Sequence, residues 1–380
     1  MSDNILERWI DMNRKKFYTM MENLENVHLI KDVGMFPYVL QKEGYFDSYI
    51  VGYGVDECDL KYLCSTIKGV KYVKRKKVTG NSIMDGIVWL VGNSKKIDIL
   101  NLYHYKKSTF IWILIYKLFN PNGKVYVKLD IDPADGMRMT MKRNTIKYFV
   151  TKYILGMASV ISCETRTFKE YADNNWPINV QYIPNAIMKE EINCNCKKEN
   201  IIISVGRMGT QQKATEILLD AFESVKDVID SSWKLVLVGS VEKNFEQRLY
   251  SSLDKCEGRI EYKGVISDRK ELSKLYERSK IFTIPSRGES FGIAALEAIS
   301  KGDYLLTTDL ISFKEISNNG QFGDFFPIDD VNTYADKIII TCKKVNGEHE
   351  VFNKIALKEY LNGEYSYESV CKKLFNLLQD

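Results

Sequence analysis

The chain has 380 residues, of which 45% are hydrophobic and 27% are charged. This length exceeds the size at which one hydrophobic core keeps growing, so we expect two domains, and the composition excludes a disordered or repetitive protein. The N-terminus lacks a charged-then-apolar signal pattern, and the apolar run FIWILIYKLF at 110–119 is only about half a membrane span. A cytoplasmic protein is therefore predicted.

The net charge of +4 is unevenly distributed along the chain. Residues 1–184 carry 27 Lys and Arg against 19 Asp and Glu, whereas the rest of the chain carries 27 against 31. The basic half suits an anionic partner such as a phospholipid surface or a pyrophosphate. Its densest run is KYVKRKK at 71–77. The alternative interpretation of this run is an edge strand that lysines protect from pairing.

In chain order, residues 1–27 have the pattern of an amphipathic helix, and residues 27–40 predict a strand, a turn at Gly34 and the start of a helix. Short β-rich runs then alternate with helical or loop segments, which predicts a parallel sheet with crossover helices. The runs are DSYIVGYG, KIDILNLY, GKVYVKLDID, ASVISCET and VQYIPNAI.

The polar stretch KEEINCNCKKEN at 189–200 has the composition of a linker, after which the pattern restarts. The segments IIISVGRM, WKLVLVGS, RIEYKGVI and KIFTIPSR predict strands, and KATEILLDAFESV and KELSKLYERS predict helices. Two successive doubly wound halves are the simplest description. The final segment, SYESVCKKLFNLLQD, predicts a helix beyond the second core.

The eight cysteines are scattered, and the closest pair, Cys194 and Cys196, has no second pair or His at zinc-ligand spacing. We therefore expect free thiols and no metal site.

The turn SVGRMGTQQK follows a predicted strand and precedes a helix, which is where an open α/β sheet presents its ligand crevice. Gly206 and Gly209 allow close approach of the backbone to a ligand. Arg207 and Lys213 place two cations before a helix N-terminus, which favours an anion. The turn is neither a Walker sequence nor a dinucleotide fingerprint, so by itself it is weak evidence for phosphate binding.

The stretch PSRGESFGIAALEAISKG at 285–302 supplies a second such turn, with Gly288 and Gly292 around Glu289. Glu297 lies among apolar residues that predict a buried helix, and a buried carboxylate needs a partner or a ligand. The alternative is a helix with one solvent-facing glutamate. A carboxylate suits the vicinal hydroxyls of a ribose or a sugar because it accepts two hydrogen bonds at once.

Together these segments resemble the family 4 retaining glycosyltransferases. GESFGIAALEA is similar to the E-x7-E signature of that family, the VGR and Lys turn precedes it at the usual distance, and YIPNAI stands where Y-x-P-N-G is common. The likeness covers about residues 180–315 well and the N-terminal half loosely.

The resemblance implies an α/β GT-B fold, with two Rossmann-like doubly wound domains that face each other across a cleft. An acceptor-binding domain would span 1–188, a nucleotide-sugar-binding domain 200–364, and a C-terminal helix at 365–380 would cross back to the first domain.

The same resemblance assigns the donor site. Arg207 and Lys213 would neutralise the diphosphate, Glu297 would hold the ribose and Glu289 the donor sugar. The donor-binding set implied is Gly206, Arg207, Lys213, Glu289, Ser290, Phe291, Gly292 and Glu297.

The sequence departs from the family pattern at several positions. Ala214 replaces a usual Gly, and Tyr304 stands where Pro is common. In the N-terminal half, where the family often presents a His near the donor sugar, Asp130 or Asp132 stands at the equivalent strand end, and His104 ends the preceding strand. We take Glu289 and Asp130 as catalytic candidates, and Gly34 and His104 as acceptor-side residues.

The implied function is retaining transfer of a sugar from a nucleotide diphosphate sugar to a glycan or lipid-linked glycan, in surface polysaccharide or glycolipid synthesis. No cofactor or metal is expected to be needed, and no nucleic acid is expected as a partner. The enzyme would be cytoplasmic, with an anionic membrane as a peripheral partner. One alternative is a sugar-nucleotide epimerase of GT-B fold, but such an enzyme would need further acid/base residues, and this chain has only three His. The other alternative is a non-catalytic partner subunit, which would tend to lose the carboxylates and cations that this chain retains.

Overall fold

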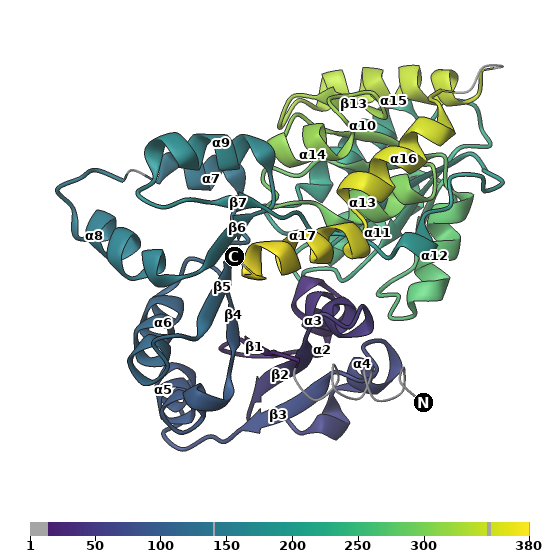
Figure 1. Cartoon of the computed structure of the whole chain (residues 1–380). Coiled ribbons are helices and arrows are strands. Elements are labelled where there is room, and N and C mark those ends of the chain that lie inside the picture. Colours follow the sequence, from purple (N-terminus) through teal and green to yellow (C-terminus); the bar gives the residue numbers. More distant parts are fainter. Residues whose placement is uncertain (1–13, 140, 348–350, 380) are drawn as a thin grey trace. The chain divides into compact units, whose positions relative to one another are not determined.

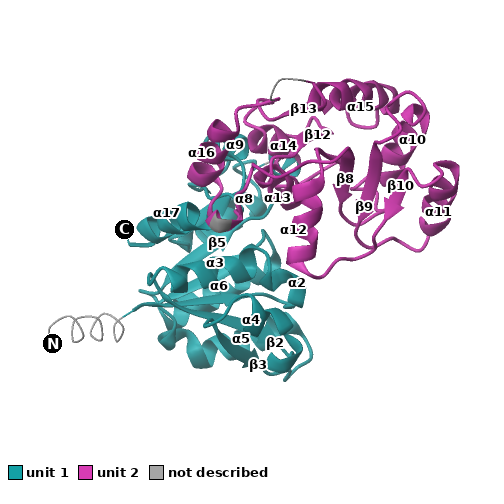
Figure 2. Ribbon diagram, turned by 90° about the vertical axis from the view of Figure 1, so that its right-hand side faces the viewer, with its two compact units in different colours: residues 1–131, 135–185, 367–380 teal, residues 132–134, 186–366 magenta. Residues whose placement is uncertain are grey.

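The computed structural model describes residues 14–139, 141–347 and 351–379. These residues form two compact units (Figure 2). Unit 1 contains the described residues of 1–131, 135–185 and 367–380, and unit 2 contains residues 132–134 and 186–366. Each unit is built on one parallel sheet whose strands alternate with helices, so the prediction of two doubly wound halves is confirmed.

The sheet of unit 1 has the strand order β3-β2-β1-β4-β5-β6-β7 (Figure 1). Its strands are β1 Lys16–Met20, β2 Asp47–Tyr53, β3 Lys71–Arg75, β4 Ile99–Tyr103, β5 Lys124–Lys128, β6 Val160–Cys163 and β7 Gln181–Tyr182. The order reverses between β1 and β4, and an open α/β sheet binds ligands at such a point, outside the carboxyl ends of its strands.

Helices connect these strands and bury their apolar sides on the sheet. They are α2 Asn26–Leu29, α3 Asp32–Lys42, α4 Lys61–Ser65, α5 Ser82–Asn93, α6 Lys107–Phe119, α7 Pro133–Arg138, α8 Ile146–Tyr153, α9 Arg166–Asn175 and α17 Tyr367–Gln379, with short 3₁₀ turns η1 Glu57–Asp59, η2 Ser94–Lys96 and η3 Leu155–Met157. The C-terminal α17 packs on α3 of unit 1, where Phe36 meets Tyr367 edge to face with ring centroids 5.8 Å apart.

The sheet of unit 2 has the order β10-β9-β8-β11-β12-β13, and its reversal lies between β8 and β11. The strands are β8 Ile201–Val205, β9 Lys234–Val238, β10 Ile260–Tyr262, β11 Ile281–Ile284, β12 Tyr304–Thr308 and β13 Gly323–Phe326. The helices are α10 Thr215–Val225, α11 Glu246–Lys255, α12 Arg269–Arg278, α13 Ile293–Ser300, α14 Ile311–Ile316, α15 Val331–Val345 and α16 Lys354–Glu364.

Alternation of side chains along β8 divides the core of unit 2 into two layers. Ile201 and Ile203 face the layer covered by α12, α13, α14 and α16, whereas Ile202 faces the layer covered by α10, α11 and α15. Both faces of the sheet are therefore buried, which explains why the strand is a continuous apolar run rather than an alternating one.

Three local predictions are wrong. Residues 16–20, placed in an N-terminal helix, form β1, and the part of that predicted helix at 1–13 lies outside the described residues. Residues 27–33, predicted as a strand, instead contribute to α2 and the start of α3. The stretch at 189–200 is not a free tether, because Ile192 and Cys194 belong to the core of unit 2 and η4 (Lys189–Glu191) begins it.

Candidate active site

The two turns that the sequence singled out lie side by side in unit 2. They follow β8 and β11, the strands that flank the reversal of strand order. The backbone N–H of Arg287 donates to the carbonyl of Gln212 at 2.8 Å, and Nε2 of Gln212 donates to the carbonyl of Gly288 at 2.9 Å. The predicted meeting of the two turns is therefore observed at the carboxyl edge of the sheet.

Lys213 and Glu289 form the centre of this junction. The Lys213 ammonium makes an ion pair with Oε1 of Glu289, and the Ser286 hydroxyl donates to the same oxygen at 2.8 Å. Glu289 is 8% exposed, so the carboxylate is held by these partners inside the turn. Lys213 and Glu289, which are both predicted to bind the donor, thus hold each other in position.

The remaining donor-side residues surround this pair. Arg207 is exposed on the turn after β8, and a Cβ built on Gly206 would lie 3.8 Å from Cδ of Lys213. The Phe291 ring is buried, with its centroid 5.8 Å from that of Tyr365. Gly292 precedes α13 with φ +94°, a left-handed conformation that glycine adopts readily. Since the Phe291 side chain is in the core, this segment can offer a ligand mainly its backbone amides.

Glu297 lies in α13 and is 9% exposed, so the solvent-facing alternative is wrong. Its Oε1 pairs with Nη1 of Arg269 at 2.7 Å, and its Oε2 accepts a hydrogen bond from the Tyr276 hydroxyl at 3.3 Å. Both partners come from α12. The charge that the sequence left without a partner is therefore neutralised by a residue 28 positions earlier in the chain.

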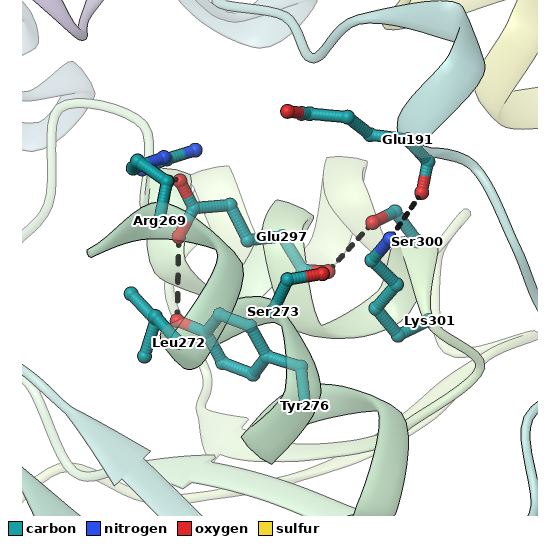
Figure 3. A pocket seen from close by; sticks show the side chains of 8 residues that line it. All are labelled: Glu191, Arg269, Leu272, Ser273, Tyr276, Glu297, Ser300 and Lys301. Atoms are coloured by element: carbon teal, nitrogen blue, oxygen red, sulfur yellow. Dashed lines mark hydrogen bonds and ion pairs between the residues drawn. The ribbon is translucent and has the colours of Figure 1, made fainter.

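Glu297, Arg269 and Tyr276 line a pocket in unit 2 (Figure 3). The other lining residues are Glu191, Leu272, Ser273, Ser300 and Lys301, whose ammonium donates to the carbonyl of Glu191 at 2.7 Å. Burial lowers the pKa of Arg269, but the Glu297 carboxylate outweighs it and raises that pKa above its usual range. A carboxylate offers about four lone-pair positions, so two contacts leave Glu297 able to accept hydroxyls from a ligand.

Arg287 was not anticipated as a site residue, yet it binds the two turns together. Its guanidinium pairs with Glu216 and with Asp329, each at 2.7 Å, and donates to the carbonyl of Gln211 at 2.7 Å. Its only sequence signal is its place next to the PS and GES residues of the second turn.

The structure explains both departures from the family pattern. Ala214 caps α10 with φ +47°, a left-handed conformation that glycine adopts without the Cβ penalty. Tyr304 begins β12, and its hydroxyl donates to Oδ2 of Asp324 at 3.0 Å, so the polar end of the larger side chain has a hydrogen-bond partner on the edge strand β13.

In unit 1, the catalytic candidate Asp130 and the acceptor-side residue His104 are neighbours. They follow β5 and β4, and Oδ2 of Asp130 lies 3.6 Å from Nδ1 of His104. Both residues have left-handed backbones, with φ +41° and +69°. Burial lowers the pKa of His104, and Asp130 only partly opposes this, so the imidazole is neutral at pH 7. Asp132 accepts a hydrogen bond from the N–H of Ala134 at 2.9 Å.

A pocket lies where the strand order of unit 1 reverses. Its walls come from the ends of β1 and β4, and include both described histidines. The lining residues are Met20, Met21, Glu22, Asn23, His28, Tyr103, His104, Lys106, Ser108 and Trp112. Its donors and acceptors can bind a polyhydroxylated molecule.

Beneath the Asp130 loop is a buried charged network that the sequence did not reveal. Lys128 Nζ and Glu164 Oε1 lie 3.1 Å apart, and both side chains are almost fully buried. The same oxygen of Glu164 accepts from the N–H of Asp130 at 3.2 Å. Burial raises the pKa of Glu164 to about 7 and that of nearby Asp32 to about 6, with Lys128 opposing both shifts. No periodic pattern marks single charges at strand ends, so they were missed.

Gly34, predicted to form a turn beside the acceptor, lies inside α3. A Cβ there would sit 2.2 Å from the carbonyl oxygen of Leu29, so glycine permits α2 and α3 to approach closely. This is a packing role, and the predicted turn at Gly34 is wrong.

The basic run at 71–77 forms the edge strand β3 and the residues after it. Lys71 pairs with Asp47 at 3.3 Å and Lys74 with Asp56 at 2.5 Å, while Arg75 is fully buried. The edge-strand interpretation is therefore confirmed, and Lys76 and Lys77, which follow the strand, are exposed.

The cysteines, the possible metal ligands and the apolar helices were also examined among the described residues. All eight cysteines are free thiols, as predicted, and within the described ranges no group of three or more His, Cys, Asp or Glu side chains is placed to hold a metal ion. No helix in the described part of the chain combines the length and apolar character needed to cross a bilayer.

Comparison with known proteins identifies the family. Residues 199–343 match the family model described as Glycosyl transferases group 1. The Uncharacterized glycosyltransferase MJ1178 of Methanocaldococcus jannaschii is 30% identical over 278 residues, which cover 72% of this chain and 71% of that protein. The chain belongs to the group 1 glycosyltransferases of the GT-B, family 4-like type.

Other similar proteins match shorter regions or the fold alone. The phosphatidyl-myo-inositol mannosyltransferase of Mycobacterium leprae is 27% identical over 139 residues, 36% of each chain, so the match spans about a third of that relative. A glycosyltransferase structure from Rickettsia africae has a TM-score of 0.77 at 16% identity, covering 97% of this chain and 100% of that one. Anabaena Alr3699/HepE in complex with UDP has a TM-score of 0.72 at 11% identity, covering 96% and 99%. These structures establish the GT-B fold.

Proposed function

We propose that this glycosyltransferase moves a sugar, with retention of anomeric configuration, from a nucleotide diphosphate sugar to a glycan or lipid-linked glycan acceptor. The observation that carries the proposal is the Lys213 and Glu289 ion pair at the junction of two turns, at the reversal of strand order in unit 2. The Anabaena protein of similar fold is in complex with UDP, which supports a nucleotide donor.

In this proposal the turn after β8 binds the diphosphate. Arg207 and Lys213 supply positive charge, and the backbone amides of Ser290, Phe291 and Gly292 supply neutral donors at the start of α13. Glu289 accepts hydrogen bonds from the donor sugar. A pyrophosphate would compete with Glu289 for the Lys213 ammonium, so donor binding would loosen one carboxylate oxygen for the sugar hydroxyls.

The pocket beside Glu297 is proposed to hold the nucleoside. Glu297 accepts hydrogen bonds from the two ribose hydroxyls, while the ion pair with Arg269 and the hydrogen bond from Tyr276 fix the orientation of its carboxylate. A vicinal diol matches a carboxylate because each oxygen can take one hydroxyl.

The transfer breaks the bond between the anomeric carbon and the phosphate oxygen and forms one to the acceptor oxygen on the same face. The acceptor proton passes to the departing phosphate, so no protein nucleophile is required. The protein's contribution is charge stabilisation of the leaving diphosphate by fixed cations and amides. No divalent metal or other cofactor is needed in this scheme.

The pocket of unit 1 is proposed as part of the acceptor site, with Asp130 and neutral His104 as hydrogen-bonding groups at its edge. Lys106 would favour an acceptor that carries phosphate. The name of the Mycobacterium leprae relative, phosphatidyl-myo-inositol mannosyltransferase, supports a lipid-linked acceptor. We place the reaction in surface polysaccharide or glycolipid synthesis, at the cytoplasmic face of a membrane.

The test is incubation of the full chain with a panel of nucleotide sugars, with and without lipid-linked glycans, while nucleoside diphosphate release and product anomericity are measured. We expect release with one donor and an α-linked product from an α-linked donor. Interconversion of two sugar nucleotides without release would instead establish an epimerase. No turnover together with retained nucleotide binding across the panel would favour a partner subunit.

A further inference from the structure

The short helix α8 of unit 1 presents an apolar face to solvent. Ile146, Phe149 and Tyr153 are 83%, 49% and 58% exposed, and Met157 just beyond the helix is 40% exposed. The three helical positions follow the spacing i, i+3, i+7, which places them on one side. Large exposed side chains in such a contiguous row mark an interaction surface.

The opposite side of α8 is firmly attached to unit 1. Val150 and Ile154 pack against the core cluster of that unit, and the Thr151 hydroxyl lies 2.5 Å from the hydroxyl of Tyr105. The rings of Phe149 and Tyr153 are parallel, with centroids 6.2 Å apart. Figure 1 shows α8 on the outside of unit 1. The helix is therefore amphipathic and anchored, and its exposed row is a fixed feature.

The charge around this row has one sign. The sequence from 136 to 163 contains five Lys and Arg and no Asp or Glu. Lys142 and Arg143, just before the helix, and Lys152, whose ammonium lies 5.5 Å from the centroid of the Tyr153 ring, are exposed. In the basic run at 71–77, Lys71 and Lys74 pair with carboxylates on neighbouring segments, and Lys76 and Lys77 are exposed.

We propose that the face of α8, defined by Ile146, Phe149 and Tyr153 with Lys142, Arg143 and Lys152, docks on an anionic phospholipid bilayer. The apolar row would enter the boundary between headgroups and acyl chains, and the cations would lie on lipid phosphates. This surface combines attracting charge with an apolar row on one helix. The proposal goes beyond the transferase activity and does not depend on it.

Other occupants fit this face less well. A second copy of the chain in a two-fold contact would place the same cations opposite each other, which is unfavourable. An eight-residue helix also offers much less than the roughly 800 Å² per partner of a stable protein interface. A nucleic acid would use the cations but leave the apolar row without a role. A bilayer accounts for both features at once.

Sedimentation of the full chain with vesicles tests the proposal, in the absence of nucleotide. We expect binding to vesicles of equal parts phosphatidylcholine and phosphatidylglycerol, and none to phosphatidylcholine alone. Lys142→Gln/Arg143→Gln/Lys152→Gln should weaken the partition coefficient about a hundredfold, since each cation near an anionic surface contributes about fivefold. Ile146→Ser/Phe149→Ser/Tyr153→Ser should weaken it at least as much, and high salt should weaken the wild type.

Matched controls distinguish binding through this face of α8 from nonspecific adsorption of the protein to vesicles. Ile355→Ser changes an apolar side chain that is 72% exposed on α16, and Lys71→Gln/Lys74→Gln removes cations of the basic run; both should bind like the wild type. The altered side chains of α8 are exposed, so thermal unfolding should be unchanged.

Three results would overturn the proposal. They are no binding to anionic vesicles, equal binding by the wild type and both triple variants, and a wild-type dimer in sedimentation velocity that only the apolar triple variant dissociates. Nucleoside diphosphate release, measured on the same variants without vesicles, reports separately on the transferase activity.

Discussion

The two units use the same architecture but build their crevices differently. In unit 2 the residues proposed for the donor come from two short contiguous turns, which hydrogen bonds at 2.8 and 2.9 Å hold together. In unit 1 the polar groups come singly from the ends of β1, β4, β5 and β6, and they rest on a buried charged network. A contiguous motif can be recognised in a sequence, whereas a site assembled from single strand ends cannot.

The largest effect on function is expected at Lys213, because this cation lies at the junction of the two turns of unit 2. Lys213→Ala should weaken nucleoside diphosphate binding at least about tenfold, since a charge-assisted contact is worth about 1.5–3 kcal/mol. Turnover should fall further, by about 10²–10³, if the ammonium also stabilises the leaving diphosphate. Arg207→Ala should weaken binding by a similar factor. Calorimetry with UDP, GDP and ADP, and release assays, measure both effects.

Lys234→Ala is the matched control for this prediction. Lys234 starts β9, at the opposite edge of the same sheet, and pairs with Glu261 at 2.8 Å. Its removal should leave both nucleotide affinity and turnover unchanged. If Lys213→Ala and Arg207→Ala fold normally by circular dichroism and bind nucleotide like the wild type, the diphosphate does not bind at this turn.

Arg269 gives the next largest effect, on stability rather than on turnover. Arg269→Ala leaves the buried Glu297 carboxylate without its cation, and breaking such a pair costs about 3–5 kcal/mol when it is fully buried. Because the Arg269 side chain is 37% exposed, solvent screening should reduce this to about 1–2 kcal/mol. Urea unfolding measures the change in the free energy of unfolding.

Arg278→Ala on the same helix is the control, because Arg278 pairs with Glu199 with both side chains about half exposed. That change should cost under about 0.5 kcal/mol. A loss of stability equal to that of Arg278→Ala would show that Glu297 does not need Arg269 when no ligand is bound. Glu297→Gln should instead keep the fold and weaken the binding of nucleosides with intact ribose hydroxyls.

The sequence predicted more of unit 2 than of unit 1 for a physical reason. The apolar runs of β8, β9 and β11 lie buried on both faces and end in Gly turns, so both the strands and the turns could be predicted from the sequence. In unit 1, β1 was mistaken for a helix because it is short and follows a polar segment. The ion-pair partner of Glu297 could not be predicted, because Arg269 lies on another helix and the residue spacing along α13 gives no information about Arg269. The same holds for Lys128 and Glu164, which meet only through pairing of β5 with β6.

A smaller effect is expected from Asp32, which tests the buried network of unit 1. Burial raises its pKa from about 4 to about 6, with Lys128 opposing. Between these values the folded chain holds a proton that the unfolded chain has lost, so this group makes the free energy of unfolding fall as pH rises through that window. In Asp32→Asn this part of the slope should disappear, while the part from Glu164, extending to about pH 7, remains.

Urea unfolding at a series of pH values from 4 to 7 measures that slope, with the exposed carboxylate variant Asp59→Asn as control. An identical slope in the wild type and Asp32→Asn would mean that Asp32 is ionised throughout this range in the folded chain.

The smallest expected effect is that of removing divalent metal, for which we predict no change in turnover. Unit 2 offers Lys213, Arg207 and the amides before α13 to a departing diphosphate, and these fixed donors can neutralise its charge without an ion. In the sequence DID, Asp130 of unit 1 lies beside His104, and Asp132, which belongs to unit 2, accepts a hydrogen bond from the N–H of Ala134. Turnover should therefore be equal in EDTA and in excess magnesium or manganese. Loss of activity in EDTA that magnesium or manganese restores would show that the cations of unit 2 are insufficient. The charge stabilisation attributed to unit 2 alone would then be shared with a metal ion, and Asp130→Asn would be the first variant to examine for weakened metal dependence.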